Sequence, residues 1–102
     1  MSIKNVSLLA TETRLLKATS ESVVFSVFFH NTDSATRTIT VYIYPNGGSA
    51  SDTTTVLKKD LPPKETLIWS ESEKFLLDTN GTFSAVADVA SKVSVCIGYK
   101  VV

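Results

Sequence analysis

Short stretches in which apolar and polar residues alternate recur along the chain, and clusters of turn-forming residues separate them. Residues 21–44 show this most clearly, because two runs rich in β-branched and aromatic residues flank the segment 31–35, Asn-Thr-Asp-Ser-Ala. β-branched and aromatic side chains suit a pleated, half-buried surface, whereas short Asn, Asp and Ser side chains hydrogen-bond nearby backbone amides in turns. The pattern predicts a β-hairpin over residues 21–44, around which the rest of the chain is organised.

The second run of this hairpin has one apolar and one mixed face. Side chains alternate across a strand, so a core face and an outer face can be assigned by position. The expected core residues are Ile39, Val41 and Ile43, and the expected outer residues are Thr38, Thr40, Tyr42 and Tyr44.

The first run is apolar on both faces. Strict alternation places Val23, Phe25, Val27 and Phe29 on one face and puts Val24 and Phe28 on the other. We therefore expect this strand to be covered on both sides, either by a second layer of the same domain or by a neighbouring subunit.

The remaining segments repeat the strand pattern without a helical period over three turns. Weak alternation over 3–12 and 13–18 indicates one or two short edge strands, and a polar, Gly-containing loop covers 45–52. Further strands are expected at 54–61, 65–70, 82–89 and 93–102, with a brief apolar run at 75–77 and an Asn-Gly turn at 80–81. This spacing predicts an all-β fold, a single antiparallel β-sandwich of about seven to eight strands, with jelly-roll-like or immunoglobulin-like connectivity.

Composition fits one soluble domain spanning residues 1–102. Apolar residues make up 43% and charged residues 20%, and ten basic residues balance ten acidic ones. A neutral chain has no broad positive field for phosphates, so no nucleic-acid binding is expected. The sequence starts without a signal-peptide pattern and has no run of roughly 20 apolar residues, so we expect no membrane insertion and a cytoplasmic site of synthesis.

Residues with catalytic chemistry are too few and too scattered to form a site. His30 is the one histidine and Cys96 the one cysteine, and both fit strand positions. The acids Glu65, Glu71 and Glu73 alternate with Lys and Ser, which is typical of a solvated strand end. We therefore expect no enzyme activity, no cofactor and no metal.

Three aromatic residues raise the question of a contact surface. Outward aromatic side chains on a sheet can stack on sugar rings or contact proteins, and Trp69 is a candidate for either role or for the core. If Tyr42 and Tyr44 point outward, we expect them to touch another subunit rather than a small ligand.

Two segments of the chain resemble small virion structural proteins of tailed bacteriophages. The first is residues 23–44, with a strand, the His-Asn-Thr-Asp-Ser-Ala segment 30–35 and a Thr/Ile/Val/Tyr strand. The second runs from Leu61 through Pro-Pro-Lys-Glu-Thr (62–66), Phe-Leu-Leu (75–77) and Asn-Gly (80–81) to the strand at 93–95, with Asn-Gly where related chains often carry Gly-Asp. The resemblance implies a compact β-sandwich used in tail, baseplate, fibre or capsid-decoration proteins, with no catalytic residues to carry over.

Two functional hypotheses follow. The first is a non-enzymatic virion subunit, assembled in the host cytoplasm, which forms a homo-oligomer and binds other virion proteins; its expected contact residues are Val24, Phe28, Tyr42 and Tyr44. The alternative is a β-sandwich binding module that recognises carbohydrate or a cell-surface protein through Trp69 and Asn46, the latter in the loop 46–52.

Overall fold

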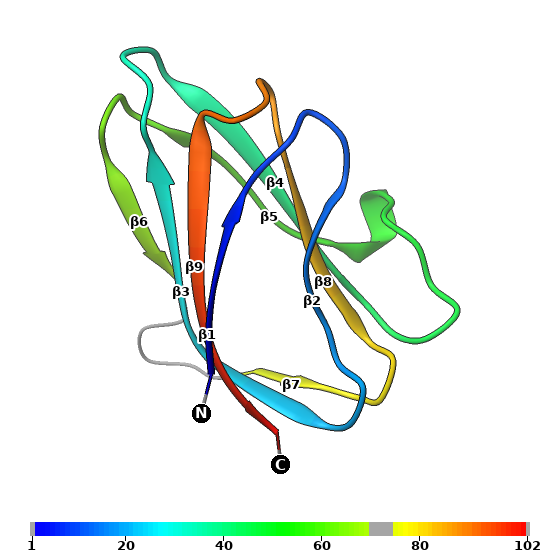
Figure 1. Ribbon diagram of the computed structural model, residues 1–102. Coiled ribbons are helices and arrows are strands. Elements are labelled where there is room, and N and C mark those ends of the chain that lie inside the picture. The colour runs from blue at the N-terminus through cyan, green and yellow to red at the C-terminus, as the bar shows by residue number, and fades with distance from the viewer. Residues whose placement is uncertain (1, 70–74, 102) are drawn as a thin grey trace.

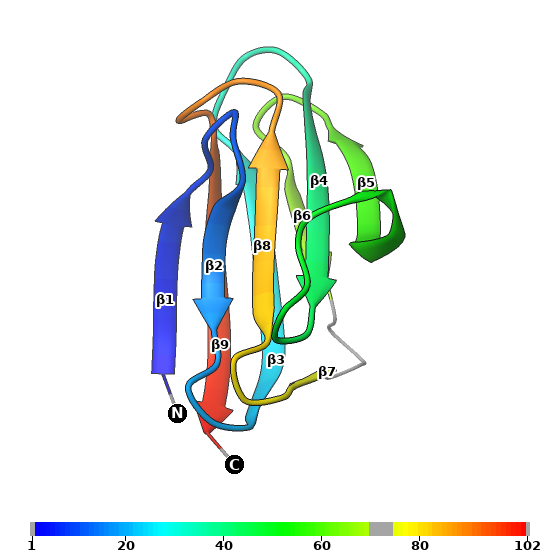
Figure 2. The ribbon, with the colours of Figure 1, turned by 90° about the vertical axis from the view of Figure 1, so that its right-hand side faces the viewer.

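The strands form two antiparallel sheets that pack face to face, as the computed structural model shows for the residues it describes, 2–69 and 75–101 (Figure 1). Sheet A has the order β1-β9-β3-β6, with β7 also paired to β3, and sheet B has the order β2-β8-β4-β5. Figure 2 looks onto sheet B, whose four strands lie side by side in that order. The bounds are β1 Ser2–Ser7, β2 Thr13–Lys17, β3 Ser22–Asn31, β4 Arg37–Tyr44, β5 Thr55–Leu61, β6 Thr66–Trp69, β7 Phe75–Leu77, β8 Thr82–Ala87 and β9 Val93–Val101, with a short 3-10 turn, η1, at Asp52–Thr54.

The predicted all-β antiparallel sandwich is confirmed. The described residues contain nine strands rather than seven to eight, because the brief run 75–77 pairs with β3 as β7. If β6 and β7 are counted as one interrupted strand beside β3, the orders β1-β9-β3-β6 and β2-β8-β4-β5 are those of an eight-stranded jelly roll. Of the two connectivities left open by the sequence, the fold has the jelly-roll one.

The predicted hairpin over residues 21–44 is wrong. β3 belongs to sheet A, where it pairs with β9, β6 and β7, whereas β4 belongs to sheet B and pairs with β5 and β8. Residues 32–36 do turn the chain, but they carry it from one sheet to the other. The buried side-chain amide of Asn31 donates hydrogen bonds to the carbonyls of Ala35, Leu61 and Pro62, and so joins the β3–β4 crossing to the β5–β6 crossing.

The core lies between the sheets and follows the alternation of the strands. Ile39 and Val41 of β4 are fully buried, and Ile43 packs against the core, as predicted. Across the interior, Trp69 stacks at a tilt against Phe29 and Phe83, with ring centroids 6.4 Å and 5.9 Å away. Such aromatic contacts add to the large apolar area that these rings bury.

A bulge in β3 reverses the alternation in its first half. The pairing of β3 with β9 shifts between Val24 and Ser26, which leaves Phe25 as the extra residue. Val24 is consequently buried in the core at 0% exposure, while Val23 and Phe25 lie on the outer side. The predictions that Val24 points outward and that Val23 and Phe25 share a face with Val27 and Phe29 are therefore wrong.

Candidate functional site

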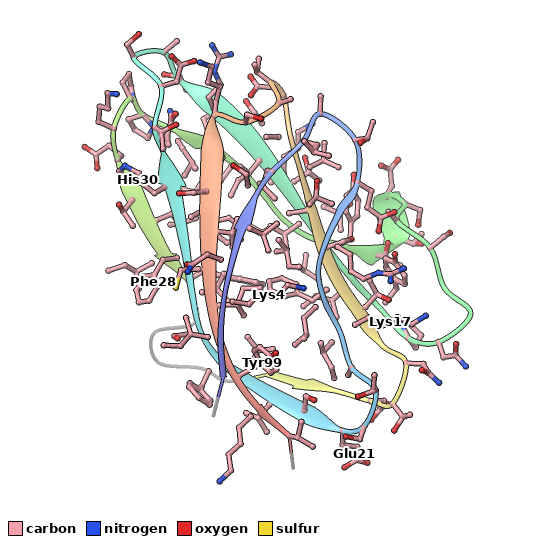
Figure 3. The ribbon with its side chains drawn as sticks, viewed as in Figure 1. Lys4, Lys17, Glu21, Phe28, His30 and Tyr99 are labelled. Carbon is pink, nitrogen blue, oxygen red and sulfur yellow. The ribbon has the colours of Figure 1, made fainter. Side chains whose placement is uncertain are left out.

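Sheet A carries a row of side chains on its outer side that crosses the whole sheet. In the strand register, Asn5 of β1 lies opposite Cys96, Cys96 opposite Phe28, and Phe28 opposite Ile68 of β6. Directly opposed residues of an antiparallel pair share one face. Figure 3 shows Phe28 directed away from sheet B, so the row faces the outside of the sandwich. Phe28 is 38% exposed and Ile68 is 51% exposed.

The neighbouring row widens this surface. Ile3 of β1, 68% exposed, lies opposite Gly98, and Gly98 lies opposite Ser26. A Cβ at Gly98 would lie 2.6 Å from Ser26 Oγ and 3.2 Å from Cε2 of Phe25, so the ring displaced by the bulge covers the glycine. We call the set Ile3, Phe25, Phe28, Ile68, Cys96 and Gly98 the apolar face. The polar residues Asn5 and Ser26 lie among them on the same side of the sheet. Exposed apolar side chains gathered on one sheet face, here Ile3, Phe28 and Ile68, are a feature of interaction sites.

The four expected contact residues do not form one surface. Phe28 belongs to the apolar face, whereas Val24 is in the core. Tyr42 and Tyr44 do point away from the core, as predicted, but they lie on the outer side of sheet B. The outer sides of the two sheets are therefore separate surfaces.

The polar surface of sheet B holds Tyr44 through a carboxylate. Glu12 accepts hydrogen bonds at Oε2 from the Ser84 hydroxyl at 2.7 Å and from the Tyr44 hydroxyl at 2.5 Å. These two bonds, that of Ser84 foremost, lower the pKa of Glu12, and the charge of Arg14 acts in the same direction. Partial burial, followed by the bond to Glu12, raises the pKa of Tyr44. The carboxylate is thus engaged by two neutral donors and holds the tyrosine in place.

We expect stability to fall in acid because of two depressed carboxyl pKa values. The side chain of Arg37, followed by the backbone N–H of Ser34, lowers the pKa of Asp33, and the bonds described above lower that of Glu12. A carboxyl group with a lowered folded-state pKa adds stability above its unfolded pKa and loses it as the pH falls through the folded pKa. The free energy of unfolding should therefore be level near neutral pH and fall below about pH 4. Urea unfolding at stepped pH measures this, and an unchanged pH slope in Glu12→Gln combined with Asp33→Asn would contradict it.

Trp69 and Asn46, the two residues of the alternative binding site, do not line a common site. Trp69 is half-buried and packs against Phe29 and Phe83 on the core side of sheet A. Asn46 is exposed in the loop after β4. A hollow of about 180 Å³ near this loop is lined by Tyr44, Pro45, Asp78 and their neighbours, and includes neither Trp69 nor Asn46.

The other residues considered for catalysis or metal binding make ordinary structural contacts. His30 Nδ1 lies 2.7 Å from the Thr66 hydroxyl of the adjacent strand, and Asp33 pairs with Arg37 at 2.7 Å. Over residues 2–69 and 75–101, no group of three or more His, Cys, Asp or Glu side chains is arranged to hold a metal ion. The acids Glu71 and Glu73 lie outside the described residues. Within the described ranges there is also no helix of the length and apolar character that crossing a membrane requires.

Part of the apolar face could be found from the sequence. Ile68 lies between Leu67 and Trp69, which both pack against the core, so strand alternation is consistent with its outward position. Phe25 was missed because its outward position depends on the bulge. Ile3 was missed because the alternation over the first twelve residues is too weak to predict which face of its strand Ile3 lies on.

Comparison of the chain with protein-family models, with curated proteins and with solved structures finds no match.

Proposed function

We propose that the protein is a non-enzymatic structural subunit of a bacteriophage particle, assembled in the host cytoplasm, and that it joins a second copy of itself through the apolar face of sheet A. The observation that carries the proposal is the exposure of Ile3, Phe28 and Ile68 together across one sheet. Burying such a surface in a contact removes apolar area from water, and this stabilises the contact by roughly 25 cal/mol for each Å² buried.

A second copy is the occupant that the composition of the face favours. The six residues of the apolar face carry no charge, and the cation Lys100, opposite the outward-facing Val23, shares this side of the sheet with them. A symmetric contact uses the same patch on both subunits, and its rotation axis would pass near the middle of the patch. Phe28 and Cys96 occupy the two central strands of sheet A, with Ile3 and Ile68 on the strands to either side.

The virion part of the proposal rests on the fold and on the sequence resemblance. The jelly roll recurs in viral capsid and lectin domains, although a fold alone does not fix a function. The two segments that resemble virion proteins add to this analogy. The binding-module alternative loses its main support, because Trp69 packs inward.

The assembly proposal predicts a charge-sensitive oligomer. We expect light scattering over a wide concentration range to give a mass above the 11.1 kDa of the monomer. Phe28→Asp combined with Ile68→Asp should give a folded monomer, because a buried unpaired charge costs several kcal/mol. Val56→Asp is the matched control, since Val56 is 48% exposed on β5 of the other sheet and should leave the oligomer intact.

Cys96 gives a second readout of the same interface. Its thiol lies on the apolar face beside Phe28, and it is half-buried. Alkylation by iodoacetamide should be slow in the oligomer and faster in the Phe28→Asp, Ile68→Asp variant. A wild-type protein that stays monomeric, or a double variant that assembles normally, would overturn the proposed interface. Mass spectrometry of gradient-purified phage particles tests the virion assignment separately, and absence of the protein from the particles would refute that assignment alone.

A further inference from the structure

Two Asn-Gly dipeptides lie in turns of different geometry. The first, residues 46–47, is in the loop that joins β4 to η1 and stands out from the sheets in Figure 1. The second, residues 80–81, is in the turn between β7 and β8. An asparagine before a glycine is prone to lose its side-chain amide, because glycine has no Cβ to hinder attack by its backbone nitrogen on the asparagine Cγ. In a folded protein the reaction depends on how that nitrogen is held.

Gly47 is the third residue of its turn, and its N–H group is unbonded. The N–H of Gly48 donates to the carbonyl of Pro45 at 2.9 Å and closes a β-turn whose two central residues are the dipeptide. Gly47 has a φ of +86°, as the third position of a type II turn requires. In the described part of the chain, neither its N–H nor the Asn46 side chain makes a hydrogen bond. Both residues are exposed, and a Cβ at Gly47 would meet no atom within 4 Å, so the reaction has room.

Gly81 is instead the fourth residue of its turn, and its nitrogen is held. Its N–H donates to the carbonyl of Asp78 at 2.8 Å, and the glycine is buried. The backbone of Ala18 fixes the dipeptide as well, because it accepts from the N–H of Asn80 at 2.6 Å and donates to the carbonyl of Gly81 at 3.0 Å. Attack by the Gly81 nitrogen therefore requires this turn to open first. The same dipeptide is accessible at 46–47 and protected at 80–81.

We propose that Asn46 is a site of spontaneous modification, at which the folded protein converts asparagine to a mixture of aspartate and isoaspartate. Hydroxide takes the proton of the Gly47 N–H, and the nitrogen attacks Cγ of Asn46. The new N–Cγ bond closes a succinimide ring, the Cγ–Nδ2 bond breaks, and Nδ2 leaves as ammonia with a proton from water. Water then opens the ring at either carbonyl. One opening gives aspartate, and the other gives isoaspartate, in which the backbone runs through the side-chain carbon.

The modification changes the charge of the protein without needing a partner or an enzyme. It adds a carboxylate to a chain whose formal net charge is zero. The new charge lies in an exposed loop that follows β4 of sheet B, whereas the apolar face belongs to sheet A. The proposal therefore does not depend on self-association or on a place in a virion.

Peptide mapping by mass spectrometry tests the proposal, with the second dipeptide as an internal control. Trypsin places the two dipeptides in separate peptides, residues 38–58 and 75–92. The folded protein is aged in mildly alkaline buffer and then digested briefly in mildly acidic buffer. Peptide 38–58 should gain the mass of the acid at least about tenfold faster than peptide 75–92, because the turn at 80–81 must open first. In guanidinium chloride both peptides should convert at similar rates, since each holds an Asn-Gly in an unfolded chain.

The variant Asn46→Gln supplies the matched control. It keeps the amide but lengthens the side chain by a methylene group, so that attack by the Gly47 nitrogen must close a larger ring. On ion exchange, aged wild-type protein should develop a more acidic form that the variant lacks. Equal conversion of the two peptides in the folded protein would overturn the proposal, as would faster conversion of peptide 75–92 or an acidic form that persists in the variant. Conversion of peptide 38–58 only in denaturant would also overturn it.

Discussion

Replacing Phe83 by alanine is expected to destabilise the fold by about 3–5 kcal/mol, the range for a buried phenylalanine truncated in a close-packed core. Phe83 is fully buried on β8, an interior strand of sheet B, and its ring lies 5.9 Å from that of Trp69. The neighbouring backbone belongs to β2 and β4, which pair with β8 on both sides, so it cannot collapse far into the cavity. A domain of this size has a total stability of about 5–15 kcal/mol, so the loss is a large share of it.

Urea denaturation measures this effect, with Phe28→Ala as the matched control. Phe28 is also a strand phenylalanine, but it is 38% exposed on the apolar face, so its truncation in the monomer should cost much less. Similar losses from the two substitutions would contradict the assignment of Phe83 to the core and of Phe28 to the outer surface. The comparison must be made at concentrations where both proteins are monomeric, since assembly adds its own stability.

Replacing Asn31 by aspartate is expected to cost about 3 kcal/mol or more at neutral pH, because it leaves a buried charge without a partner. The Asn31 Nδ2 group donates to the carbonyls of Ala35, Leu61 and Pro62 at 2.9, 3.0 and 3.2 Å. An aspartate carboxylate has the same shape, but it would place an oxygen against these three carbonyl oxygens. The Oδ1 atom of Asn31 accepts from the N–H of Asp33, and that one bond would survive.

The pH dependence of the Asn31→Asp variant shows whether its destabilisation comes from the added charge or from a change in side-chain shape. Repulsion by the carbonyls should raise the pKa of the new carboxyl, so the penalty should shrink as the pH falls and the group becomes protonated. Asn46→Asp introduces the same change in the exposed loop after β4 and should alter the free energy of unfolding by less than about 0.5 kcal/mol. A neutral effect of Asn31→Asp would mean that the two sheet crossings do not depend on this amide.

Periodicity predicted where most strands lie but not which strands pair. Ile39 and Val41 alternate regularly in the sequence and are buried as expected, because a regular strand fixes its own faces. The segment 31–35 was correctly predicted to turn the chain. Asn, Asp and Ser are, however, equally suited to a hairpin turn and to a crossing between sheets, so these residue types did not distinguish the two. In the crossing, Asn31 bonds to the carbonyls of residues 61 and 62, about thirty positions away, and no local pattern contains such a long-range contact.

The candidate site was only partly predictable for a similar reason. Phe28 was assigned to the outer face by alternation, whereas residues 23–25 were assigned to the wrong faces because a bulge shifts the register between Val24 and Ser26. A bulge adds one residue to one strand only, so it becomes visible only when the partner strand β9 is known.

The position of β9 also affects how the chain can fold as it is synthesised. β9, residues 93–101, lies between β1 and β3 in sheet A, although β1 and β3 are made first. Until the ribosome has released this last strand, the first strand lacks its partner and one side of β3 lacks its neighbour. Sheet A should therefore close only after translation of the domain is complete, and nascent chains that end before residue 93 should remain sensitive to protease and exposed to chaperones.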